Sequence, residues 1–300
     1  MHQVDFSPPD QRDRVIDLAP SPGCPCCARR SMLRALALAP LLSASGIVLG
    51  REGIDVGQTS MFARLIPAEQ IEKVAALQYR QMLQQAAAAK KLAPAEHPSV
   101  RRLRSIAGSF LRHTVGWNPR AKDWKWEVHL IQSKEINAFC MPGGKIVFFS
   151  AILDTLRLSD DETATVMGHE MAHALREHAR ERLGKSTATS LGVSLLGQVL
   201  GLGDLGRELT NLGAKLLTLQ FSRSDESEAD LVGMELAARA GFDPRAGISL
   251  WQKMAAASKG APPQWLSTHP SNDARIGDIR ASLPKVLPLY RPASSATGRP

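Results

Sequence analysis

Cysteine is scarce in this sequence, with 4 residues among 300. Cys24, Cys26 and Cys27 precede an apolar segment near the N-terminus, and Cys140 is the only cysteine after that segment. A single thiol cannot form an intramolecular disulfide, so the rest of the chain is expected to fold without one. The three clustered cysteines have no partner cluster with the spacing of a metal site, so we expect no structural metal there.

Long apolar runs are also missing. Residues 35–49 form an apolar run of about fifteen residues that contains Pro40, whereas a membrane-spanning helix needs about twenty. Residues 186–203 carry no charge, but glycine, serine and threonine dilute their apolar content. We interpret residues 186–203 as a helical or loop insertion near the cleft of the site described below; the alternative is a membrane-contacting segment.

The N-terminal region has the pattern of a targeting signal rather than that of a folded element. Arg29 and Arg30 precede the apolar run, and small residues cluster near Ala44, as in a bacterial export signal of the twin-arginine type. We therefore expect residues 1–50 to be a signal peptide with an N-terminal extension, and the protein to be periplasmic. Retention as an N-terminal membrane anchor, or a translation start at Met32 that leaves an ordinary signal, are the alternatives.

Motifs for nucleic-acid binding are absent, although the formal net charge is +8 and the pI is about 9.6. Residues 101–104 include three arginines, but no helix-turn-helix, zinc-finger or RNP-like pattern accompanies them. We expect no nucleic-acid partner and interpret this segment as a solvated helix face. If the basic patch binds anything, the surface of an anionic envelope membrane is the more natural partner.

The composition of the chain is that of a globular protein, 44% hydrophobic and 22% charged. Its periodicity predicts helices over 68–91 and 99–113 and a β region over 124–149. Proline and small polar residues predict a disordered tail over 286–300. We therefore expect one mainly helical α+β domain with a small sheet over residues 51–285.

Residues 169–173 read HEMAH, on a helix predicted over 162–182. At 100° per residue, His169 and His173 lie about 40° apart around the helix axis and one turn from each other. Two neutral imidazoles so placed can bind one zinc ion, and Glu170 between them can accept a proton from a water molecule. The pattern predicts a zinc site with the chemistry of amide hydrolysis.

The third ligand decides the class of zinc enzyme. Metzincins require glycine and histidine at the positions that Arg176 and Ala179 occupy here, so that class is excluded. His178 lies nine residues after His169, about 900° of rotation, which places it on the opposite side of a continuous helix. We interpret His178 as solvated or structurally hydrogen-bonded.

Glu226 and Asp230 are better candidates, because they share one face of a second predicted helix. If Glu226 binds the metal, Asp230 is placed to accept the free ring N–H of a ligating histidine. Glu228 lies about 200° around the helix from Glu226 and points elsewhere. The alternative is an acidic, solvated first turn, but the upstream motif favours the ligand interpretation.

Two further segments carry candidate residues. The strand around Asn137 and Ala138 is predicted either to present its edge to an extended peptide or to be a plain meander. His269, before a proline in a predicted loop, is a candidate for a hydrogen bond to a substrate oxyanion or for the open coordination position of the metal; a structural loop histidine is the alternative.

Four motifs occur in one order, and together they resemble a known family. They are NAF with PGG at 137–144, GHEMAHALREHAR at 168–180, SRSDESEAD at 222–230 and THPSNDARI at 268–276. The set resembles the HtpX and CAAX-prenyl-endopeptidase family of zinc gluzincins, and within it the soluble periplasmic branch of BepA and LoiP type, over about residues 55–285. Membrane-embedded members carry several spans that this sequence lacks, so their prenyl-substrate specificity is not carried over.

The resemblance implies a zincin-type fold with a helix that carries HExxH and a second helix that carries a glutamate ligand. It implies one zinc ion per chain, held by His169, His173 and Glu226, with Glu170 as the catalytic base. Asp230 would support a ligand from the second coordination sphere. It also implies that Asn137 and Ala138 run along the cleft and that His269 approaches the metal or the oxyanion.

From this resemblance we expect an exported zinc metalloendopeptidase in quality control of misfolded or unassembled envelope proteins. The expected partners are unfolded or misassembled protein substrates, with peripheral contact to the envelope membrane or to the outer-membrane assembly machinery. The alternative is a periplasmic chaperone or assembly factor whose peptidase activity is latent or gated.

Overall fold

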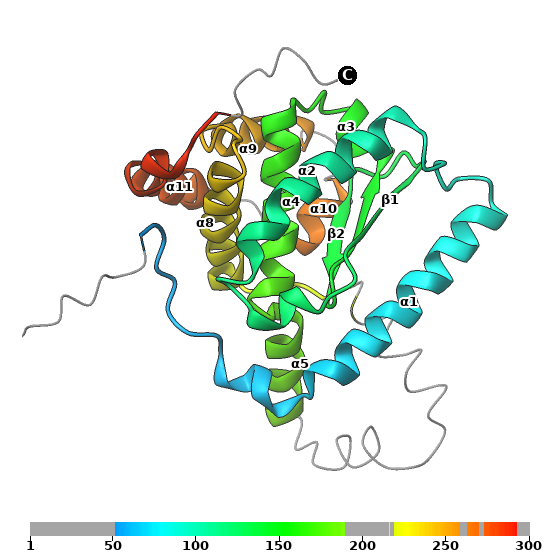
Figure 1. Ribbon diagram of the computed structural model, residues 1–300, viewed down its shortest axis with the longest axis horizontal. Helices are drawn as coiled ribbons and strands as arrows, with labels where there is room; N and C mark the ends of the chain where they lie inside the picture. The colour runs from blue at the N-terminus through cyan, green and yellow to red at the C-terminus, as the bar shows by residue number, and fades with distance from the viewer. Residues whose placement is uncertain (1–51, 190–215, 217–218, 259–262, 270–272, 293–300) are drawn as a thin grey trace, which may run out of the picture. The chain divides into compact units, whose positions relative to one another are not determined.

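The computed structural model describes residues 52–189, 216, 219–258, 263–269 and 273–292. The chain divides into two units, Met1–Val48 and Leu49–Pro300, and all described residues belong to the second. Helices predominate over one small sheet (Figure 1), so the expected α+β class is confirmed. The cysteine cluster, the expected export signal and residues 190–203 lie outside the described residues.

The described helices and strands follow the predicted order closely. The predicted helices at 68–91 and 99–113 are confirmed, and three strands lie within the predicted β region. The helices are η1 Met61–Leu65, α1 Ala68–Ala88, α2 Pro98–Thr114, η2 Pro119–Lys122, α3 Ser150–Asp154, α4 Asp160–Leu175, α5 His178–Thr189, α8 Arg223–Arg239, α9 Ala246–Ala257, α10 Gln264–Thr268, α11 Asp273–Val286 and η3 Leu287–Leu289. The strands are β1 Glu127–Ile131, β2 Ala138–Met141 and β3 Lys145–Phe149.

The sheet has the strand order β1-β3-β2, with β1 parallel and β2 antiparallel to β3. Successive side chains of β3 point to opposite faces of the sheet, as in any β-strand, and so they pack in two different hydrophobic cores. Val147 packs with Tyr79 of α1, whereas Ile146 and Phe148 pack in the core that contains residues of α2 and α4. The central strand is therefore covered on both faces, and β2 forms the edge of the sheet beside α4.

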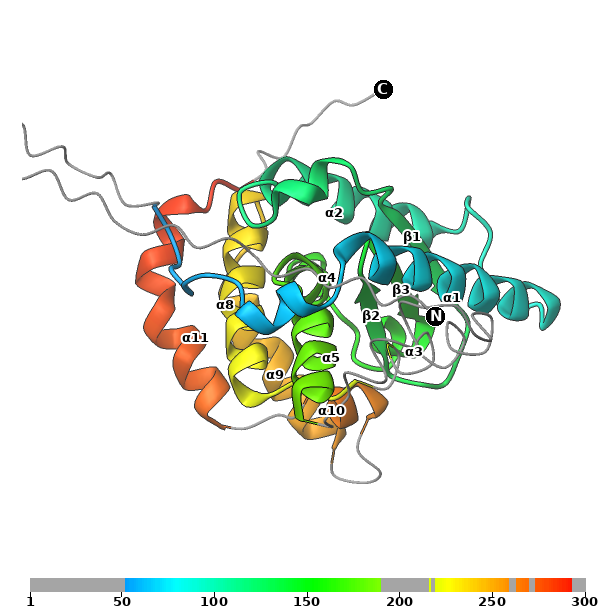
Figure 2. The ribbon, with the colours of Figure 1, turned by 90° about the horizontal axis from the view of Figure 1, so that it is seen from below.

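The helix α4 lies between α8 and the sheet (Figure 2). Its start is fixed by a capping box: Glu162 N donates to Ser159 Oγ at 3.2 Å, and Ser159 N donates to Glu162 Oε2 at 2.9 Å. Acidic residues at 160–162 face the positive end of the helix dipole. This rigid, buried helix carries the HExxH segment.

The predicted single helix over 162–182 is wrong, because the chain breaks between α4 and α5. Glu177 adopts a left-handed conformation with φ 60°, which disfavours a continuous helix. The break turns Arg176 and His178 into the interior, where Arg176 donates to Gly57 O at 2.9 Å. Tertiary contacts of these polar groups therefore override the helical preference of the local sequence.

The helices α4 and α8 cross at two glycines. A Cβ atom on Gly168 would lie 2.6 Å from Gly233 O, and one on Gly233 would lie 2.6 Å from His169 N. Only glycine permits so close an approach of two backbones. The crossing brings the HExxH segment of α4 next to the acidic first turns of α8.

The C-terminal helices α9, α10 and α11 complete the described fold, and α11 packs along α8 (Figure 2). The helix η3 follows α11 over part of the range predicted as a disordered tail. Within the described residues, no helix has both the length and the apolar character needed to cross a membrane.

Candidate metal centre

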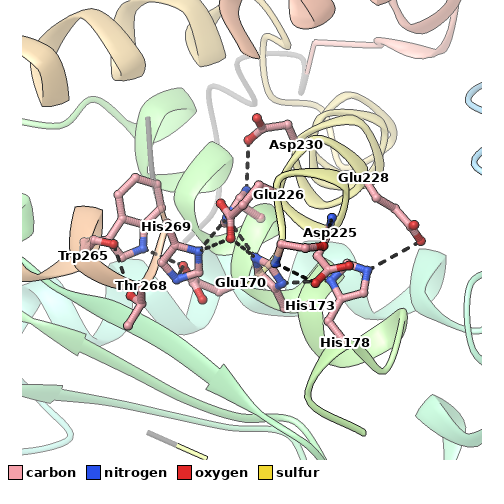
Figure 3. Close-up of polar contacts among 12 residues, drawn as sticks. Glu170, His173, His178, Asp225, Glu226, Glu228, Asp230, Trp265, Thr268 and His269 are labelled. Carbon is pink, nitrogen blue, oxygen red and sulfur yellow. Dashed lines mark hydrogen bonds and ion pairs between the residues drawn. The ribbon is translucent and has the colours of Figure 1, made fainter. Parts of the chain in front are cut away.

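Four buried side chains meet at one point (Figure 3). His169 and His173 lie one turn apart on α4, Glu226 lies in the first turns of α8, and His269 follows α10. Each side chain offers one ligand atom, and these atoms lie within 4.8 Å of one another. None of the four residues is more than 3% exposed.

The distances among these atoms fit one small cation. His169 Nε2 lies 3.1 Å from His173 Nε2, 3.2 Å from His269 Nδ1 and 3.5 Å from Glu226 Oε2. Glu226 Oε1 lies 3.0 Å from His269 Nδ1 and 3.5 Å from His173 Nε2. Ligand atoms at about 2.0–2.1 Å from a tetrahedral metal lie about 3.3–3.4 Å from one another. The converging nitrogen and oxygen lone pairs therefore fit a divalent metal ion.

The His169 ring is hydrogen-bonded to Asp230, and Asp230 is paired with Arg275. Asp230 Oδ1 lies 3.0 Å from His169 Nδ1 and accepts its ring N–H. Arg275 donates to Asp230 through Nε at 2.6 Å and Nη2 at 2.8 Å, and its Nη1 lies 2.8 Å from Glu226 Oε2. The guanidinium also lies over the Trp251 ring, 3.8 Å from the ring centroid. These contacts place the Nε2 lone pair of His169 toward the other ligand atoms.

The His173 ring contacts His178. The prediction that His178 lies on the opposite side of a continuous helix is wrong. Because the helix breaks after Leu175, His178 lies on the side of His173 and is 1% exposed, with the two Nδ1 atoms 2.9 Å apart. It is structurally hydrogen-bonded, one of the two environments expected for it. Phe221 stacks on the His173 ring, with centroids 4.0 Å apart.

Glu170 faces the same point from α4 and is 2% exposed. Trp265 Nε1 donates to Glu170 Oε1 at 2.7 Å, and His269 Nε2 lies 3.5 Å from the same oxygen. One carboxylate oxygen is therefore fixed by a neutral donor from α10. This contact orients the carboxylate without adding a charged partner.

Burial and neighbouring charges set the pKa values of the cluster in different directions. Burial lowers the pKa of His169, but hydrogen bonds and charges of Asp230 and Glu226 outweigh it and raise the pKa to about 9. Burial holds the pKa of His173 well below its usual value. Burial would raise the pKa of Glu226, but hydrogen bonds from His169 and His269 lower it. The negative charge that favours a proton on His169 is the same charge that a divalent cation would neutralise.

A cleft opens beside these residues. It is bordered by the edge strand β2 on one side and by Glu170 and His173 on the other. Its lining residues are Asn137, Ala138, Phe139, Cys140, Met141, Pro142, Glu170, His173, Ala174, Ala179, Leu216, Leu219, Phe221, Gln264, Thr268 and His269. The predicted cleft segment at Asn137 and Ala138 lies in this lining, where Asn137 Oδ1 accepts from Ala138 N at 2.9 Å.

The structure thus brings together every residue that the sequence singled out as a ligand, base or supporting carboxylate. Their chemical roles stay predictions, which the experiments below test. Sequence reasoning missed Trp265 as the partner of Glu170, Phe221 as the partner of His173 and Arg275 as the partner of both acidic residues. Arg275 and His269 belong to one short motif, THPSNDARI, and that shared motif was the available signal for Arg275.

Comparison with known proteins gives relatives of two kinds. The chain is 41% identical over 167 residues to the mitochondrial metalloendopeptidase OMA1 of Schizosaccharomyces pombe, covering 55% of this chain and 48% of the relative. It is 32% identical to human OMA1, covering 57% and 35%, and 32% identical to the Escherichia coli beta-barrel assembly-enhancing protease, covering 53% and 35%. The matched region thus spans half or less of these relatives.

These relatives correct two expectations from the sequence. They are OMA1 and beta-barrel assembly-enhancing proteases rather than HtpX or CAAX-prenyl endopeptidases, so the expected BepA-type branch is matched only in part. The expected periplasmic location is contradicted, because OMA1 relatives from several organisms are mitochondrial proteins. Arginines before an apolar run therefore do not identify a compartment in this sequence.

A separate match, to a model of a whole protein family, shows the family. The model of peptidase family M48 matches residues 109–283, which is more than half of the chain and includes β1 through most of α11. The matched range contains Glu170 and the four clustered residues that could hold a metal ion. It also contains Asp230 and Arg275, which support His169. The expected enzyme class, a metallopeptidase, is confirmed, and the chain belongs to peptidase family M48.

Proposed function

We propose that this chain is a zinc-dependent metalloendopeptidase that hydrolyses unfolded or misassembled proteins, including membrane proteins that fail to assemble. The observation that carries the proposal is the convergence of His169, His173 and Glu226 beside Glu170 at one cleft. One relative is named a beta-barrel assembly-enhancing protease, and this name supports substrates that have to assemble.

The ligand set favours zinc, with one ion per chain. Two imidazole nitrogens and one carboxylate oxygen are typical of catalytic zinc sites, which keep a further position for water or substrate. When bound, zinc would polarise the scissile carbonyl and acidify a water molecule. His169, His173 and Glu226 would hold the ion, and Asp230 would fix the ring orientation of His169.

Glu170 is the proton carrier in this mechanism. Its Oε1 accepts a hydrogen bond from Trp265 Nε1 at 2.7 Å, so the second oxygen is the one available to a water molecule. Glu170 accepts the proton from the attacking water and returns it to the leaving amine. Because Trp265 is neutral, it orients the carboxylate without the charge pairing that would weaken it as a base.

The edge strand β2 supplies the binding mode for a substrate. An extended peptide adds to such an edge through backbone hydrogen bonds, which impose little sequence preference. Met141, Phe221 and Leu219 add apolar surface to the cleft, which suits segments that folded proteins keep buried. Unfolded chains meet both conditions.

The test is hydrolysis of casein by purified wild type and by Glu170→Gln. The amide keeps the shape of the side chain and removes the proton acceptor, so turnover should fall by about 10²–10⁴-fold while zinc content is unchanged. A chelator should abolish wild-type turnover, and added zinc should restore it. Glu181→Gln on α5 is the matched control and should retain activity.

Equal turnover by Glu170→Gln and wild type would refute the assigned base. Binding of casein by both proteins without hydrolysis would instead support the alternative function, an assembly factor with a gated peptidase. The position of His269 among the ligand atoms is the specific observation that favours gating.

A further inference from the structure

A chain of polar groups, buried at His178 and Arg176 and half-buried at Glu228, extends behind His173 on the side away from the ligand cluster (Figure 3). His178 Nδ1 lies 2.9 Å from His173 Nδ1. His178 Nε2 lies 3.6 Å from Glu228 Oε1, and Arg176 Nε donates to the same oxygen. Arg176 is itself fixed by its hydrogen bond to Gly57 O at 2.9 Å. The side chains of His178, Glu228 and Arg176 have no role in the mechanism proposed above.

The proton positions along this chain follow from the ligand geometry. His173 Nε2 faces His169 Nε2 and Glu226, so it must present a lone pair if it is to bind a cation. The ring proton of neutral His173 is then on Nδ1, and a contact between two Nδ1 atoms needs only one proton. His173 therefore donates and His178 accepts. The proton of His178 is left on Nε2, the atom that faces Glu228.

The two histidine ligands are thus supported in parallel ways. His169 is held by Asp230, which Arg275 binds. His173 has no carboxylate against its Nδ1 among the described residues; an imidazole takes that place, with a carboxylate and an arginine behind it. Support of a ligating imidazole through its other ring nitrogen fixes both the tautomer and the direction of the lone pair.

We propose, on the basis of the zinc site proposed above, that His178 is a positioning residue for His173. It accepts the Nδ1 proton of His173 and thereby directs the Nε2 lone pair to the metal, and Glu228 selects the tautomer of His178 that can do so. Arg176 holds Glu228 in place and ties it to the segment at Gly57.

The backbone between α4 and α5 supports this role. Glu177 holds a left-handed conformation, which is unfavourable for a residue with a side chain. In an uninterrupted helix His178 would lie far around the axis from His173. The unfavourable conformation is the local change that brings His178 within hydrogen-bond distance, and such conformations persist where surrounding contacts require them.

The experiment measures zinc affinity rather than activity. Zinc dissociation constants are determined by chelator competition for wild type, His178→Leu and His178→Asn, together with the melting temperature of each metal-free protein. Leucine preserves apolar bulk but has no acceptor, whereas the asparagine Oδ1 lies near the position of the imidazole Nδ1. His178→Leu should weaken zinc binding by about 10–100-fold, and His178→Asn should restore most of the loss.

Two comparisons separate positioning from packing. The visible absorption spectrum of the cobalt-substituted protein should change in the leucine variant and return toward wild type in the asparagine variant, because it reports ligand geometry. His113→Leu, a half-buried histidine on α2, is the control and should leave both measurements unchanged. If the leucine variant does not fold, His178→Gln replaces it. The glutamine amide lies near the position of the imidazole Nε2, so this variant also lacks an acceptor at the Nδ1 position.

Wild-type zinc affinity and cobalt spectrum in His178→Leu would overturn the proposal and leave His178 a packing residue. The proposal would also be overturned if His178→Asn bound zinc as weakly as His178→Leu or as weakly as His178→Gln. Failure of the wild type to bind zinc would refute the proposed metallopeptidase function itself, which distinguishes the two failures.

Discussion

His269 has the contacts of a group that competes for the metal. Its Nδ1 lies 3.0 Å from Glu226 Oε1 and 3.2 Å from His169 Nε2, inside the ligand set, whereas its Nε2 lies 3.5 Å from Glu170 Oε1. A donor to a substrate oxyanion would need to point into the cleft. The His269 ring lines the cleft and also lies between Glu170 and the expected ligand atoms. We predict the coordination-position role, because the His269 Nδ1 lies beside atoms of two expected ligands, Glu226 and His169.

The substitution His269→Ala separates these roles. Loss of a competing ligand should raise casein turnover by more than about twofold, whereas loss of an oxyanion donor should lower it by about a hundredfold. We expect the increase, with zinc content unchanged. Turnover and elemental analysis on the same preparation check it, with His113→Ala as control. A hundredfold loss would contradict the competing role, and turnover equal to wild type would leave a structural role.

At the scale of elements, the crossing of α4 and α8 sets the distance between the HExxH helix and Glu226, the proposed third ligand. Gly233→Ala places a methyl group where its Cβ would lie 2.6 Å from His169 N. The helices must separate, so the free energy of unfolding should fall by about 1–3 kcal/mol, and zinc affinity should fall with it. Chemical denaturation and chelator competition measure the two effects.

Gly108→Ala on α2 is the matched control for this crossing. A Cβ at Gly108 meets nothing within 4 Å, so alanine there should stabilise the helix by about 0.5–1 kcal/mol and leave zinc affinity unchanged. Equal stability and affinity in Gly233→Ala and wild type would show that the close crossing does not set the ligand geometry.

The same elements show how far the sequence predicts the site. His169 and His173 follow from helical spacing alone, and the acidic first turn of α4 marks where that helix starts. Glu226 becomes a strong candidate only because the first motif demands a third ligand. The break at Glu177 could not be predicted, because the contacts that stabilise it come from Gly57 and Glu228, which are distant in sequence.

Trp265 and Arg275 illustrate the same limit at the C-terminal end. Trp265 Nε1 reaches Glu170 across 95 positions of sequence, and Arg275 reaches Asp230 across 45. No periodicity within either segment encodes which carboxylate it meets. Local patterns predicted the elements and the ligand chemistry, whereas the partners of the base and of the supporting carboxylate depend on how α10 and α11 pack against α4 and α8.

At the scale of the whole described unit, the metal centre joins segments that are distant in sequence. Its groups come from α4, from α8 and from the stretch of α10 to α11 that carries His269 and Arg275. Two buried carboxylates, Glu226 and Asp230, share the single guanidinium of Arg275. A divalent cation would balance this excess of negative charge, so we expect metal binding and the packing of these helices to be thermodynamically coupled.

This coupling predicts that removal of the metal lowers the melting temperature of the entire folded unit. Zinc at about a thousandfold above its dissociation constant should add about 4 kcal/mol to the free energy of unfolding, since it binds the native state alone. Calorimetry with and without chelator measures the shift, which should grow with the logarithm of free zinc concentration. His173→Ala should melt at the same temperature in both conditions, because it lacks a ligand. An equal chelator-induced shift in His173→Ala and wild type would mean that the chelator acts elsewhere than at this centre.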